Sequence, residues 1–188
     1  MEKDLVEIRW HGRAGQGAVT SAELLAKAAI GEGKFAQAFP AFGPDRRGPP
    51  LVAFNRINAT KPIRVRAGIT EPNIVVLLDE TVLRVVNATE GLRKGGLVIV
   101  NSRKPEGELR TMLADNWCVA TVDATRIARE TLGVPIVNTT MLGALVKASA
   151  VVKLESLIEP LQERFGRLAA ERNVNAVNRA LEETRVLS

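Results

Sequence analysis

Three short, mainly apolar runs most constrain the fold of this chain. They are NIVVLL at residues 73–78, LVIV at 97–100 and VATV at 119–122. Apolar runs of this length are typical of strands that are covered on both faces. Helical patterns follow at 81–94, which two glycines close, and at 124–132. This alternation of strand and helix predicts an α/β fold.

The first thirty residues predict a strand, a tight turn and a helix. Residues 5–10 alternate apolar and polar side chains, and the glycine-rich run HGRAGQG occupies residues 11–17. In the following helical segment, Ala22, Leu25, Ala26 and Ala29 share one face of mainly small side chains. That helix is therefore expected to lie close against the sheet and to end at Gly31 to Gly33.

Residues 35–66 interrupt this regular pattern. Four prolines and two glycines within residues 35–50 predict an ordered loop rather than a helix or a central strand. Residues 51–57 and 63–66 look like strands, and the turn-forming run 58–62 between them predicts an antiparallel hairpin. The sheet is therefore expected to be mixed. Further helices are predicted at 139–151, with Asn138 as N-cap, at 154–164 and at 168–185.

A chain of 188 residues has a length typical of one hydrophobic core, so a single domain over residues 1–188 is expected. The predicted architecture is a three-layer α/β/α domain with a mostly parallel, mixed sheet of the Rossmann-like kind. No apolar run approaches the roughly 20 residues that cross a bilayer. The acidic start MEKDL also lacks the features of a signal peptide, so a cytoplasmic protein without a membrane partner is expected.

The chain has few residues that could bind a metal ion or act as a catalytic acid or base. The chain has one cysteine, Cys118, whereas an iron–sulfur cluster needs about four, so any cluster is expected on a partner. His11 is the only histidine, which argues against a histidine metal site or a Ser/His/Asp triad and predicts a structural hydrogen bonder. Asp79, Glu80 and Asp123 follow buried strands, where helix capping is the expected role.

The glycine-rich turn has two interpretations. Gly12, Gly15 and Gly17 form the pattern GxxGxG between a strand and a helix, a context in which backbone N–H groups bind phosphate. The spacing differs from the dinucleotide pattern GxGxxG, and the lysine of a Walker loop is missing. A tight turn without a ligand explains the glycines equally well.

The positive charge of the chain is concentrated in one segment. The net charge is +5, yet residues 34–66 alone carry seven Lys or Arg against one acid, a net +6. Adjacent Arg46 and Arg47 lie between prolines, and arginine binds phosphate or carboxylate through two parallel hydrogen bonds. The segment is expected to meet an anion, either a small ligand or the carboxylates of this fold or of a partner subunit. Few aromatic residues and no nucleic-acid motif argue against nucleic acid.

Five motifs together resemble the gamma subunits of the 2-oxoacid:ferredoxin oxidoreductase superfamily, in particular those of pyruvate:ferredoxin oxidoreductase (pyruvate synthase). They are EIRWHGRAGQG, AFPAFGPDRRGPP, VAFNRI, PIRVR and NTTMLGALVK, in this order along almost the whole chain. The loop FGPDRRGPP resembles the pyruvate branch more than the 2-oxoglutarate branch.

The resemblance implies a hetero-oligomer in which alpha, beta and delta subunits accompany this chain and ferredoxin accepts the electrons. Thiamine diphosphate, iron–sulfur clusters and coenzyme A (CoA) would belong to the complete complex, with no catalytic residue and no cofactor on this chain alone. The expected contacts with CoA or with a neighbouring subunit are Gly12, Arg13, Gly15, Gln16, Gly17, Arg46 and Arg47. Three alternatives remain open. They are the same role in an oxidoreductase of the 2-ketoisovalerate, 2-oxoglutarate or phenylglyoxylate type, a stand-alone nucleotide-binding protein, and a structural spacer within a complex.

Overall fold

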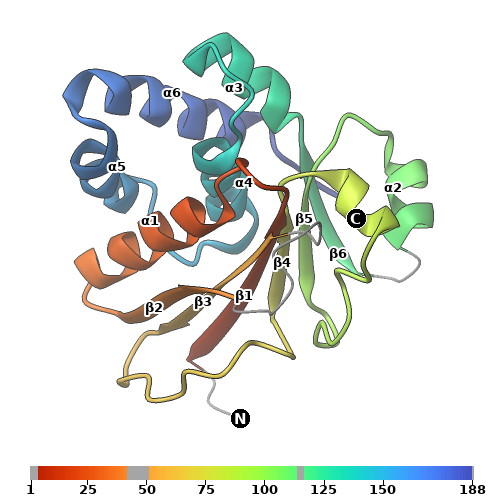
Figure 1. Cartoon of the computed structure of the whole chain (residues 1–188), viewed down its shortest axis with the longest axis horizontal. Coiled ribbons are helices and arrows are strands. Elements are labelled where there is room, and N and C mark those ends of the chain that lie inside the picture. The colour runs from red at the N-terminus through yellow and green to blue at the C-terminus, as the bar shows by residue number, and fades with distance from the viewer. Residues whose placement is uncertain (1–3, 42–50, 114–116, 188) are drawn as a thin grey trace.

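The computed structural model describes residues 4–41, 51–113 and 117–187. Within these residues, seven strands form one sheet in the order β2-β3-β1-β4-β5-β6-β7 (Figure 1). The strands are β1 (Leu5–Gly12), β2 (Phe35–Pro40), β3 (Leu51–Asn58), β4 (Ile74–Leu77), β5 (Leu97–Asn101), β6 (Cys118–Val122) and β7 (Arg185–Leu187).

Six α-helices and two 3-10 helices complete the described part of the chain. The α-helices are α1 (Ala18–Gly31), α2 (Glu106–Leu113), α3 (Ala124–Leu132), α4 (Asn138–Ser149), α5 (Ile158–Phe165) and α6 (Arg167–Glu183). The 3-10 helices are η1 (Glu80–Arg84) and η2 (Glu155–Leu157).

The sheet is mixed, as predicted. Strands β1, β4, β5 and β6 pair in parallel, while β3 pairs antiparallel with both β1 and β2, and β7 pairs antiparallel with β6. The predicted α/β fold is confirmed. The continuous apolar runs became the central parallel strands because both of their faces are covered.

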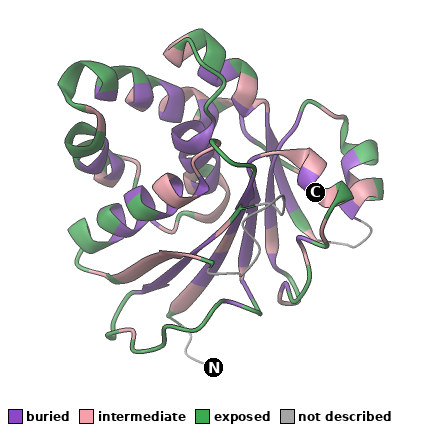
Figure 2. Cartoon of the chain, in the orientation of Figure 1, coloured by how far each residue is buried: buried purple, intermediate pink, exposed green. Residues whose placement is uncertain are grey.

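The two faces of the sheet are covered differently. Ile8, Trp10 and Val76 pack with α1, α3, α4 and α6 on one side, which we call the α4 face. Val75 and Val98 point the other way and pack with η1 and α2, on what we call the α2 face. Figure 1 shows α1, α4, α5 and α6 gathered on one side of the sheet and α2 on the other, and Figure 2 shows how fully the central strands are buried.

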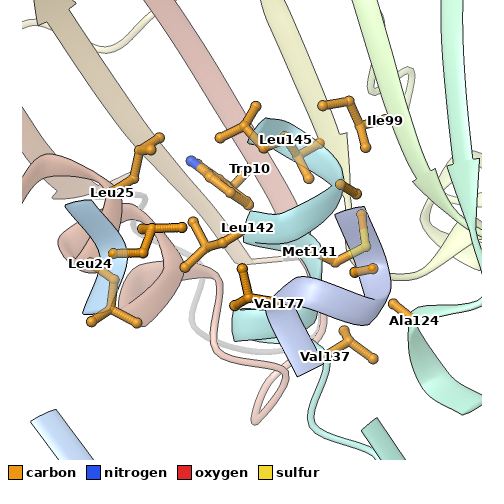
Figure 3. Packing of buried hydrophobic residues seen from close by; sticks show 14 of the residues in the cluster. Trp10, Leu24, Leu25, Ile99, Ala124, Val137, Met141, Leu142, Leu145 and Val177 are labelled. Atoms are coloured by element: carbon orange, nitrogen blue, oxygen red, sulfur yellow. The ribbon is translucent and has the colours of Figure 1, made fainter. Parts of the chain in front are cut away.

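Trp10 lies at the centre of the α4 face, among Leu25 of α1 and Leu142 and Leu145 of α4 (Figure 3). Its indole Nε1 donates to Asn55 Oδ1 at 2.8 Å, and Asn55 Nδ2 donates to the Ala22 carbonyl of α1 at 2.8 Å. Asn55 is fully buried, yet both ends of its amide are bonded. The predicted small-residue helix α1 is thus held directly on β3.

Residues 35–66 differ from their prediction. Residues 35–40 form the edge strand β2 instead of a loop, and residues 63–66 form no strand. Strand β3 pairs with β1 on one side and with β2 on the other. Neither edge of β3 is therefore free to form the predicted hairpin with residues 63–66. Gln37 Nε2 of β2 donates to the Ile63 carbonyl at 3.0 Å, which fastens the later segment near the edge strand.

The predicted helix at 81–94 is wrong beyond η1. After Arg84 the chain continues in turns whose backbone groups bond elsewhere: the carbonyls of Ala88 and Glu90 accept from the Arg9 guanidinium. The Arg93 N–H donates to the Pro72 carbonyl at 3.0 Å. Tertiary bonds therefore replace helical ones here. Helix α2 and strand β7 were not predicted, while the prediction for α3 at 124–132 matches.

Candidate functional site

The neighbouring parallel strands β1 and β4 continue to opposite faces of the sheet. After β1 the chain enters α1 on the α4 face, and after β4 it enters η1 on the α2 face. In open α/β sheets, ligands bind at such a switch point, beyond the carboxyl ends of the strands. The predicted glycine-rich turn, residues 12–17, lies at this point.

Two glycines of the turn adopt a conformation that other residues rarely take. Gly15 and Gly17 have φ angles of 85° and 83°. A Cβ on Gly17 would also come within 2.8 Å of the Asn138 side chain at the start of α4. Helix α1 begins directly after Gly17, and no side chain caps it. The first N–H groups of α1 are therefore not bonded by a capping side chain, and with the helix dipole they favour binding of an anion.

Arg13 and Gln16 of the turn are bonded to the segment after β4. Gln16 Oε1 accepts from the Arg13 N–H at 2.7 Å, and Gln16 Nε2 donates to Asp79 Oδ2 at 3.1 Å. Arg13 Nε lies 3.3 Å from Asp79 Oδ2, and the Arg13 guanidinium donates to Thr81 Oγ1 at 2.8 Å. The two strand ends are therefore joined by side chains as well as by the sheet.

Asp79 is the acidic centre of this network. Partial burial opposes its ionisation, but hydrogen bonds from the Thr81 hydroxyl and N–H and from Gln16, with the nearby Arg13 charge, keep its pKa below the ordinary value. Asp79 also caps η1 through the Thr81 N–H at 2.9 Å, as predicted. Its carboxylate is thus an internal anchor at neutral pH rather than a proton donor.

A cavity of about 690 Å³ opens beyond the ends of β4, β5 and β6. It brings together the three predicted carboxylates, Asp79, Glu80 and Asp123, with Gln16 of the turn. Asp123 caps α3 through the Arg126 N–H at 3.0 Å, as predicted. Polar residues absent from the prediction also line the cavity: Thr81, Asn101, Ser102, Arg103, Thr125, Arg126 and Arg129.

Several of these residues are held by hydrogen bonds around the cavity. Asn101 Nδ2 donates to the Leu78 carbonyl and to Thr125 Oγ1, both at 2.9 Å. The Ser102 hydroxyl donates to the Glu80 carboxylate. Asn101 and Ser102 follow directly after the run LVIV, and this position behind a buried strand is the sequence signal that could have identified them.

His11 is the next-to-last residue of strand β1, and its side chain is buried. Neither ring nitrogen has a hydrogen-bond partner among the described residues, so the expected structural hydrogen bond is not present there. Burial, and then the neighbouring Arg9 charge, lower the His11 pKa to about 4. The imidazole is therefore neutral at physiological pH.

The basic segment 34–66 is divided by the fold. Arg56 is buried and donates to Glu7 Oε1 at 2.8 Å, and Lys34 pairs with Glu32 at 2.7 Å, so part of the charge is neutralised within the fold. Arg64 and Arg66 are exposed and form no ion pair with a described residue. The predicted contacts Arg46 and Arg47 lie outside the described residues.

The described part of the chain lacks both a metal-binding cluster and a membrane-spanning helix. It holds no cluster of three or more His, Cys, Asp or Glu that could bind a metal ion. No described helix is long and apolar enough to cross a membrane. Cys118 is exposed at the start of β6 and is the chain's single cysteine, so its residues do not fit an iron–sulfur cluster.

Comparison with known proteins gives consistent matches over nearly the whole chain. The family model for pyruvate ferredoxin/flavodoxin oxidoreductase matches residues 7–183. The chain is 50% identical over 181 residues to the pyruvate/ketoisovalerate oxidoreductases common subunit gamma of Thermococcus kodakarensis, covering 96% of this chain and 97% of that protein. It is 47% identical over 179 residues to pyruvate synthase subunit PorC of Methanothermobacter thermautotrophicus, covering 95% and 96%.

A solved structure agrees with these matches. The crystal structure of pyruvate oxidoreductase subunit PORC from Thermotoga maritima superposes with a TM-score of 0.87 at 38% identity, covering 99% of this chain and 100% of that one. Fold, sequence and length therefore all indicate the same family. The chain belongs to the pyruvate ferredoxin/flavodoxin oxidoreductase family, as a gamma-type subunit.

Proposed function

We propose that this chain is the gamma subunit of a cytoplasmic pyruvate synthase. The complete enzyme would convert pyruvate, CoA and oxidised ferredoxin to acetyl-CoA, CO₂ and reduced ferredoxin. Alpha, beta and delta subunits would hold thiamine diphosphate and the clusters, and the isolated chain would be inactive. The main support is the likeness to a relative named pyruvate synthase subunit PorC over 95% of the chain.

The substrate is tested best in the complete complex. Alpha, beta and delta subunits from the same host are co-expressed with and without this chain, and viologen dye reduction is followed with CoA and one 2-oxoacid at a time. We expect pyruvate to give the highest kcat/KM, and only when this chain is present. A preference for 2-oxoglutarate, or full activity without the chain, would overturn the proposal.

A second candidate has its own support. The Thermococcus kodakarensis relative is named as common to pyruvate and ketoisovalerate oxidoreductases. A chain shared by two complexes would co-purify with two different sets of partner subunits. Mass spectrometry of the tagged chain, purified from its host, distinguishes one set of partners from two.

Within the complex, we assign the turn residues Gly12, Arg13, Gly15, Gln16 and Gly17, with Arg46 and Arg47, to contacts with CoA or with a neighbouring subunit. The support is twofold. The turn precedes an uncapped helix at a switch point, where anions bind in related folds. The arginines belong to the segment that carries a net +6.

The double variant Arg46→Ala/Arg47→Ala tests this assignment. We expect a several-fold higher KM for CoA in an assembled complex, or loss of assembly if the loop contacts a subunit. The matched control is Arg64→Ala/Arg66→Ala, which removes two exposed charges from the same segment. Unchanged assembly and unchanged KM for CoA in the first variant would refute the assignment.

The alternative that does not involve a larger enzyme is a stand-alone nucleotide-binding protein. Ligands that bind only the folded state raise the melting temperature. If ATP or NAD raised the melting temperature of the isolated chain by several degrees, that result would favour a nucleotide-binding protein over an oxidoreductase subunit.

A further inference from the structure

A concave apolar surface lies beside the start of α4, outside the cavity described above. The connection from α3 to α4 carries Val134 and Ile136, which are 44% and 41% exposed. Together with Leu132 and Phe165 they line a pocket of about 290 Å³ between this connection and the junction of α5 with α6. Two β-branched apolar side chains are thus exposed in the lining of one pocket.

Two arginines border the same pocket. Arg164 lies in the last turn of α5 and Arg172 lies on α6, and both line the pocket and are exposed. Neither forms an ion pair or a side-chain hydrogen bond with any residue in the ranges that the structure describes. Arg179, further along α6, is paired with Glu130 at 2.8 Å and Glu183 at 2.9 Å. Helix α6 therefore pairs one arginine within the fold and leaves another without a carboxylate at the pocket.

The size and chemistry of this surface favour a protein occupant. Small-molecule sites usually measure roughly 300–1,000 Å³, so this pocket of about 290 Å³ is at the small end of their range. Protein interfaces instead concentrate their binding energy in apolar pockets that accept single anchor side chains, with arginine enriched around them. The unpaired guanidiniums favour a segment that brings carboxylates.

We propose that this surface, formed by Val134, Ile136 and Phe165 with Arg164 and Arg172, docks an acidic segment of a partner subunit. That segment inserts an apolar side chain between Val134 and Ile136 and places carboxylates against the two arginines. Membership in a family of multi-subunit oxidoreductases supplies such a partner, whichever 2-oxoacid the complex uses. None of these five residues is among those assigned above to contacts with CoA or a neighbouring subunit.

The apolar half of the proposal is tested by Ile136→Asp in the complex co-expressed with its partner subunits. We expect at least a tenfold loss in the amount of this chain that co-purifies, because a carboxylate would replace an apolar contact and would repel the acidic segment. Val186→Asp on strand β7, where the valine is 55% exposed, is the matched control and should leave co-purification unchanged. If Ile136→Asp melts like wild type and co-purifies in full, the proposal is wrong.

The charged half is tested by Arg164→Glu/Arg172→Glu. We expect several-fold weaker association at low salt, a smaller effect at high salt, and partial recovery with lysine at both positions. Lys147→Glu, an exposed cation on α4, is the control for net charge. Unchanged or tighter association of the double variant would overturn the proposal.

A second copy of this chain is the competing occupant. Analytical ultracentrifugation of the isolated chain should give a monomer. A dimer that Ile136→Asp converts to monomer would assign the surface to self-association and overturn the proposal.

Discussion

The two faces of the sheet are stabilised in different ways. On the α4 face, Trp10 lies among apolar side chains, and buried Asn55 has partners at both ends of its amide. On the α2 face, the same strand β1 presents Glu7, Arg9 and His11. The Arg9 Nε atom and both ring nitrogens of His11 have no hydrogen-bond partner among the described residues.

The α4 face thus depends mainly on close packing, and the α2 face depends mainly on electrostatic interactions. Helices cover the α4 face tightly, so changes in side-chain volume should disturb it most. On the α2 face, the part of the sheet formed by β1 and β3 is stabilised by the Glu7 carboxylate. This carboxylate accepts hydrogen bonds from Arg56 at 2.8 Å and from Arg93 at 3.0 Å. Changes in charge and pH should act mainly there.

The largest effect is expected from Glu7→Ala. The substitution leaves the buried Arg56 guanidinium without its carboxylate, which typically costs about 3–5 kcal/mol. Urea unfolding of the isolated chain measures the change, with exposed Glu171→Ala on α6 as the control. A loss below about 1 kcal/mol would show that the pair does not hold the α2 face.

The next effect is expected on the α4 face, from Gly143→Ala. A Cβ at Gly143 of α4 would lie 2.2 Å from the Val177 carbonyl oxygen of α6, so the two helices would have to separate. Overpacking of this kind costs about 3 kcal/mol, at the upper end of its usual range. Gly107→Ala on α2 is the control, because its Cβ meets nothing within 4 Å. Equal stability of both variants would contradict the close packing of α4 on α6.

A pH-dependent effect of about 2 kcal/mol is expected from His11. Its pKa is about 4 in the folded chain and 6.5 in the unfolded chain, so the unfolded state binds the proton first. The stability contribution is complete above pH 6.5 and is lost as the pH falls toward 4. Between pH 7 and pH 5, wild type should lose about 2 kcal/mol more than His11→Gln. Parallel pH profiles of the two proteins would show that His11 is not buried as described.

The smallest effect is expected at the turn between the two faces, from Gln16→Ala. The variant loses the acceptor for the Arg13 N–H and the donor to Asp79, worth about 1 kcal/mol together in this half-exposed position. Exposed Gln162→Ala on α5 serves as the control. Identical urea midpoints for both variants would show that the Gln16 network contributes nothing to stability.

Local patterns predicted the parts of the fold that depend on neighbours in the sequence. The continuous apolar runs identified β4, β5 and β6, and the run from Ala124 to Leu132 identified α3 together with its Asp123 cap. The helix predicted at 81–94 failed because Arg9, distant in sequence, bonds the carbonyls of Ala88 and Glu90. Strand β2 was missed because the four prolines of residues 35–50 suggested a loop, although an edge strand tolerates Pro40 at its end.

The candidate site was predicted only in part for the same reason. The glycine-rich turn and Asp79 were visible because each directly follows a strand. The bonds of Gln16 to Asp79 and of Arg13 to Thr81 join residues more than 60 positions apart, which no local pattern encodes. Asn138 was predicted to cap α4. It is instead the first residue of that helix and packs against Gly17, where any Cβ would clash with it.

The most direct test is purification of the tagged chain from its native host under anaerobic conditions. If the chain is a gamma subunit, it should elute in a brown complex that contains thiamine diphosphate and reduces viologen with pyruvate and CoA. Recovery of a colourless lone monomer would contradict that role.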